Sequence, residues 1–226
     1  MKFTLYSYLL SLCVLSGCSN ISSQNNHHIV NDVLESSYQD IDNSLSKRRS
    51  NLLFNNDEVA NNCNSYFLLN SKYDVDESVY NQQVKSEYLI CDALEILLNS
   101  SSVTNSIIND SSFGEKLASK LDLRTFPSSL HRAGTEKAHT LKSIFPEQFK
   151  SFDNVVEVET EDWAFTIEAV AMAKINDNSL PDWIVWVLDE SKSGNYRGYS
   201  TLIIYDPEER KNIKATVYPQ VCGSVC

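Results

Sequence analysis

The chain has 226 residues, 42% of them hydrophobic, and a formal net charge of −11. This length suits one substantial domain or two small ones, and the apolar content can supply a core. Because nucleic-acid affinity comes mainly from neutralising phosphates, the charge argues against a nucleic-acid partner; it favours solubility and would suit a basic protein partner.

The first residues have the pattern of a secretion signal. Lys2 precedes an apolar run from Phe3 to Leu15, which is shorter than the roughly 20 apolar residues that span a bilayer. "LSGC" at residues 15–18 follows and resembles the lipobox of bacterial lipoproteins. The resemblance implies a signal peptide over residues 1–17, cleavage before Cys18, and acyl chains on Cys18 that anchor the protein to a membrane.

The same resemblance implies a location. In that family an Asp after the lipidated Cys favours the inner membrane, whereas Ser19 implies the outer membrane, facing the periplasm or the cell surface. Residues 18–28, "CSNISSQNNHH", are polar and unpatterned, which predicts a flexible tether. We expect its last residues, His27 and His28, to be solvated, and a single domain to occupy residues 29–226.

A helical part is predicted over residues 29–145. Apolar residues recur at three- and four-residue spacing in this part, which is typical of amphipathic helices. The expected helices span about 30–49, 57–69, 76–98, 112–121 and 136–145.

Four cysteines remain after the lipidated one, an even number that suits an oxidising compartment. Cys63 and Cys91 fall on the apolar faces of two expected helices, while Cys222 and Cys226 lie close together near the C-terminus. Four cysteines allow three connectivities. We favour Cys63–Cys91, which leaves Cys222–Cys226.

The apolar period changes to two between residues 155 and 219. Runs such as "DWAFTIEAVAMA" and "YRGYSTLIIYD" are joined by short polar turns, which predicts a four- to five-stranded antiparallel meander sheet. Helices followed by strands predict an α+β fold, with the N-terminal helices packed on one face of the C-terminal sheet.

The turn "KINDNSLPD" at residues 174–182 weakly resembles the calcium-binding hairpins of FG-GAP and VCBS-type repeats. The resemblance makes Asn176, Asn178 and Asp182 candidate ligands. Lys174 stands where the first acidic ligand belongs, and Ser179 replaces the usual Gly. Calcium requires several anionic oxygens, so we predict a metal-free turn and no cofactor.

The sequence indicates a cellular location more clearly than it indicates a biochemical activity. It contains no phosphate-binding loop, no G-x-S-x-G elbow and no H-E-x-x-H motif. Four aromatic residues are candidates for a binding surface, with plain packing as the alternative: Trp186, Tyr196, Tyr199 and Tyr205.

We therefore predict a lipid-anchored cell-envelope protein with a non-catalytic binding or structural domain. The first alternative is a periplasmic inhibitor or immunity lipoprotein that blocks a toxic or lytic enzyme. The second is an envelope hydrolase in which His131 would combine with a distant Ser and Asp, since catalytic triads are defined by geometry rather than by sequence position.

Overall fold

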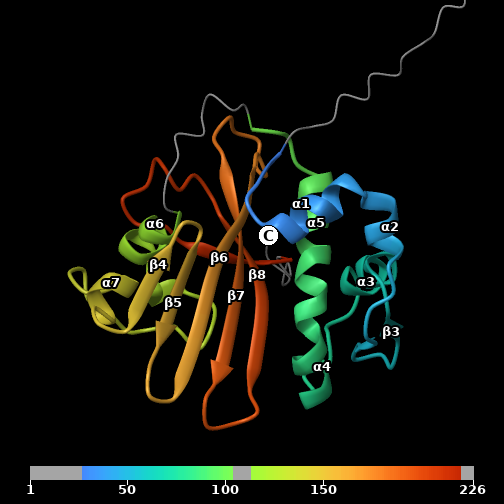
Figure 1. Ribbon diagram of the computed structural model, residues 1–226, viewed down its shortest axis with the longest axis horizontal. Helices are drawn as coiled ribbons and strands as arrows, with labels where there is room; N and C mark the ends of the chain where they lie inside the picture. The colour runs from blue at the N-terminus through green and yellow to red at the C-terminus, as the bar shows by residue number, and fades with distance from the viewer. Residues whose placement is uncertain (1–26, 104–112, 220–226) are drawn as a thin grey trace, which may run out of the picture.

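The computed structural model describes residues 27–103 and 113–219, which form an α+β fold (Figure 1). The predicted lipidation site Cys18 and the predicted pair Cys222 and Cys226 lie outside these residues. A search of the described part for a helix long and apolar enough to cross a membrane found none.

One antiparallel sheet of seven strands organises the fold. Its order is β4-β5-β6-β7-β8-β9, and β1 pairs with the end of β6. The strands are β1 (His28–Ile29), β4 (Phe149–Phe152), β5 (Val155–Glu159), β6 (Trp163–Ala173), β7 (Asp182–Ser191), β8 (Arg197–Ile204) and β9 (Ala215–Tyr218). A separate two-stranded hairpin consists of β2 (Leu52–Leu53) and β3 (Val59–Ala60).

The prediction of four to five strands was too low, because β1 and β4 are part of the same sheet. The two residues of β1 and the four of β4 are too few to show a period in the sequence. His28 pairs with Met172, and the His27 ring lies edge-on to Tyr38 with 5.5 Å between ring centroids. The folded domain therefore starts within the segment that we expected to be a tether.

Short helices replace the longer ones that we expected. They are α1 (Asp32–Gln39), α2 (Ile41–Ser46), α3 (Cys63–Asn70), α4 (Val79–Val84), α5 (Leu89–Leu98), α6 (Phe113–Lys120) and α7 (Leu141–Ile144), with 3₁₀ turns η1 (Lys85–Tyr88) and η3 (Leu123–Thr125). The second helix begins at Cys63 rather than at Asp57. Asp57 has a positive φ of 66° in the hairpin turn, and Asn62 with Ser65 forms a capping box instead.

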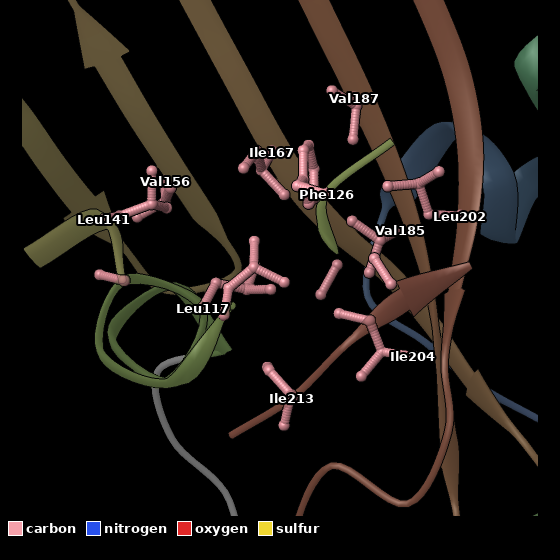
Figure 2. Packing of buried hydrophobic residues seen from close by; sticks show 14 of the residues in the cluster. Leu117, Phe126, Leu141, Val156, Ile167, Val185, Val187, Leu202, Ile204 and Ile213 are labelled. Atoms are coloured by element: carbon pink, nitrogen blue, oxygen red, sulfur yellow. The ribbon is translucent and has the colours of Figure 1, made fainter. Parts of the chain in front are cut away.

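Helices cover both faces of the sheet, not one face as predicted. Val185 and Leu202 point toward Leu117 of α6 on the first face (Figure 2), whereas Ile184 and Ile203 pack with Leu94 of α5 on the second. The run "WIVWVL" in β7 is apolar at successive positions, which is the pattern of a strand buried on both faces.

The predicted disulfide between Cys63 and Cys91 is confirmed. It joins α3 to α5, and both residues are fully buried. A third apolar cluster surrounds it, to which Leu52, Tyr66 and Tyr88 contribute.

Candidate interaction surface at one end of the sheet

The two ends of the sheet differ in what they carry. The chain enters at the end where β6 leads into the turn at residues 174–182, because β1 pairs with Ala171 and Met172. We call this the entry end. The opposite, far end carries the β7–β8 connection, and Figure 1 shows α4 beside that connection.

Two aromatic side chains from different strands meet at the far end. The rings of Tyr196 and Trp163 pack edge to face, with centroids 5.6 Å apart, while Tyr196 remains 42% exposed. The Tyr196 hydroxyl lies over Gly198, where an added Cβ would come within 2.8 Å of that oxygen. A side chain at residue 198 would therefore displace the phenol.

Helix α4 approaches the same end of the sheet, beside the start of β8. The backbone N–H of Arg197 donates to Gln82 Oε1 of α4 at 3.4 Å, and the exposed side chains of Val79 and Tyr80 begin the same helix. Burial raises the pKa of Tyr196, and the nearby charges of Asp189 and Glu77 raise it further. The far-end surface is defined here as Val79, Tyr80, Trp163 and Tyr196.

The charge around the far-end surface is negative. Glu159 and Glu190 are paired with Lys192 and Arg197 at 3.5 and 3.6 Å. Three further acids are exposed and form no ion pair with any part of the chain that the structure describes: Glu77, Glu161 and Asp162. A partner at this surface would meet apolar rings bordered by free carboxylates.

Asp189 lies beneath the far end and holds a loop in place. Its carboxylate is 2% exposed and accepts the Ser129 hydroxyl at 2.5 and 2.6 Å and the Ser129 N–H at 3.1 Å. Burial raises the pKa of Asp189. Within residues 27–103 and 113–219, the hydrogen bonds of this Ser–Asp pair do not include the ring of His131, the residue named for the hydrolase alternative.

The turn at residues 174–182 brings the three candidate metal ligands together around backbone donors. Asp182 is fully buried, and its carboxylate accepts the N–H groups of Ile175 at 2.9 Å, Asn176 at 3.3 Å and Asp206 at 3.0 Å. Asn178 donates to the Asp206 carboxylate at 2.7 Å. Amide hydrogens thus occupy the positions around Asp182 that a cation would need.

The four aromatic residues proposed from the sequence do not form one surface. Trp186 and Tyr205 pack against the cluster under α1 and α5, and Tyr199 is 8% exposed and donates to Glu190. Strand β8 separates Tyr196 from Tyr205 by about 30 Å at 3.3 Å per residue. Only Tyr196 lies on the far-end surface.

Sequence reasoning missed Val79, Tyr80 and Trp163 as members of this surface. The six-residue α4 has too few positions to show which side packs. The approach of Gln82 to Arg197 joins positions 115 residues apart, and no local pattern reports such a contact.

Comparisons with protein-family models, with curated proteins and with solved structures found no match for this chain.

Proposed function

We propose that the protein is a lipid-anchored component of the cell envelope, held on the outer membrane through Cys18. Its folded domain acts as a non-catalytic binding module that presents the far-end surface to a protein partner. The observation that carries this proposal is the pairing of β1 with β6, because it places the start of the domain at the end of the sheet opposite Tyr196.

The length of the intervening chain supports this orientation. The nine residues that follow Cys18, up to and including His27, can extend by at most about 32 Å. The ten residues of β7 span a similar distance, about 33 Å. An anchor at Cys18 therefore keeps the entry end within about 32 Å of the bilayer. The far-end surface lies at the end of the sheet away from the attachment point.

The charge distribution supports a basic partner. Residues 27–103, which include α4, contain 12 acidic and 5 basic residues, a net −7; residues 113–219 contain 17 and 13, a net −4. Aromatic side chains supply contact area at protein interfaces, and complementary charge accelerates encounter. The free carboxylates beside the far-end surface also support a more specific role, that of an inhibitor or immunity protein against a basic toxic or lytic enzyme.

The anchor is tested by replacing Cys18. The Cys18→Ala variant should lose metabolic labelling with palmitate and should move from the membrane fraction to the soluble envelope fraction. Unchanged labelling and fractionation would defeat the lipoprotein proposal.

The binding surface is tested with two matched variants of the mature domain. Tyr80→Ser/Tyr196→Ser alters the far end, whereas Val33→Ser/Leu98→Ser alters apolar residues of α1 and α5 that are more exposed and lie near the entry end. Affinity capture from envelope extract should recover a basic protein with wild type and with the entry-end variant, but not with the far-end variant. Loss of capture in both variants, or in neither, would contradict the proposed surface.

A further inference from the structure

A buried carboxyl group sits where three elements meet. Asp92 of α5 is 5% exposed. Its Oδ1 accepts the hydroxyl of Tyr66 from α3, and its Oδ2 accepts the hydroxyl of Thr201 from β8, both at 2.8 Å. Among the ion pairs of the described residues none involves Asp92, so its charge is met by hydroxyl dipoles rather than by a cation.

A second acid of the same helix faces the same pair of strands. Glu95 is hydrogen-bonded to Tyr218 of β9. Tyr218 is the cross-strand partner of Thr201, so both acids of α5 lie over one register pair of the sheet. Lys85 of η1 is the cation that acts on Asp92, without forming an ion pair with it.

Keeping a carboxylate ionised in this position is energetically unfavourable. Removing a charge from water without a paired counter-charge is strongly unfavourable, and the usual response is neutralisation. Burial raises the pKa of Asp92 to about 7, although the hydroxyls of Tyr66 and Thr201 and the charge of Lys85 oppose the rise. Burial also raises the pKa of Glu95, while its hydrogen bond to Tyr218 acts in the opposite direction.

The disulfide determines which contact of Asp92 can change when its carboxyl group gains or loses a proton. The Cys63–Cys91 disulfide ties α3 to α5 next to Asp92, and so limits how far Tyr66 of α3 can move from Asp92. The contact between α5 and the sheet has no such link. Helix α4 continues through η1 into α5, and Figure 1 shows α4 and α5 stacked along the sheet. When α5 packs on β8, it therefore helps to hold α4 against the sheet, where Gln82 of α4 accepts the backbone N–H of Arg197.

We propose that Asp92, with Glu95, Thr201 and Tyr218, forms a proton-controlled latch between α5 and the sheet. The protonated carboxyl group seats α5 on β8 and β9, and loss of the proton loosens α5 together with α4. Because α4 carries Val79 and Tyr80, the latch would also regulate the far-end surface; this consequence rests on the proposed function, whereas the latch itself does not.

The direction of the pH effect follows from linkage. A group whose pKa is higher in the folded state than in the unfolded state binds more protons when folded. Its stabilising effect is complete below the ordinary pKa of 3.8 and is lost as the pH rises through about 7. The α5–sheet contact should thus be firmer at pH 6 than at pH 8. Partly buried His27, whose pKa burial lowers, acts in the opposite sense and is present in every variant.

The test is hydrogen exchange of the disulfide-bonded protein at pH 6 and pH 8, corrected for intrinsic exchange rates. In wild type, amides of α5 and of the Arg197 region should lose protection at least threefold on going to pH 8. Asp92→Asn, which is neutral and of the same shape, should remove this change. An identical pH response in wild type and Asp92→Asn, or no response in wild type, would overturn the latch.

A second variant allows the test to be made even if the Asp92→Asn protein fails to fold. Tyr66→Phe removes one hydroxyl that favours the ionised carboxylate, so the midpoint of the exchange transition should move to higher pH. A midpoint that stays in place or moves to lower pH would contradict the assignment to Asp92. Because the exchange test needs no binding partner, failure of partner capture with an intact exchange response would remove the proposed function and leave the latch standing.

Discussion

Removing the disulfide should show how strongly the helical part depends on it. We consider Cys63→Ala/Cys91→Ala, which removes the bond and leaves small apolar side chains in the buried cluster. The two cysteines are 28 positions apart. In the chain-entropy model, a loop of this length constrains the unfolded chain by about 3.5 kcal/mol, which is the expected loss of stability.

The assay is urea unfolding at equilibrium, followed by circular dichroism. The midpoint should fall, and the m-value should rise because the unlinked unfolded chain exposes more surface. Cys222→Ala/Cys226→Ala is the matched control, since the predicted ring of five residues between them would constrain the unfolded chain by at most about 2 kcal/mol. A loss below about 1 kcal/mol in Cys63→Ala/Cys91→Ala, with an unchanged m-value, would refute the view that this bond acts through the unfolded state.

Three further predictions concern the turn and the C-terminus. Asp182→Ala should destabilise the domain by about 3 kcal/mol or more, because three backbone N–H groups lose a charged acceptor, whereas the exposed Asp177→Ala should have little effect in the same thermal scan. The melting temperature should be the same with calcium as with EDTA, because backbone N–H groups already bind the Asp182 carboxylate. A clear rise with calcium would instead support a metal site. Peptide mapping without reduction should recover Cys222 linked to Cys226, and recovery of two free thiols would disprove that pairing.

The sequence alone contains part of the evidence for Asp92 as a buried acid. It interrupts "LICDALEILL", one of the most apolar stretches of the chain, and lies four residues after Tyr88 and four before Ile96. Residues at this spacing share one helix face, so an acid on the buried face of α5 was visible before the structure. The hydroxyls of Tyr66 and Thr201 were not, because they come from segments 26 and 109 residues away.

The sequence by itself determined the features that depend on near neighbours along the chain. Alternation predicted the long central strands, and helical spacing placed Cys63 and Cys91 on inward faces that the disulfide joins. Only the tertiary structure decided how these elements associate. It added β1 and β4 to the sheet, covered both sheet faces, and separated Tyr196 from Tyr205. The physical reason is that a period in the sequence reports which side of an element is apolar, whereas its packing partner is selected by contacts between residues far apart in the chain.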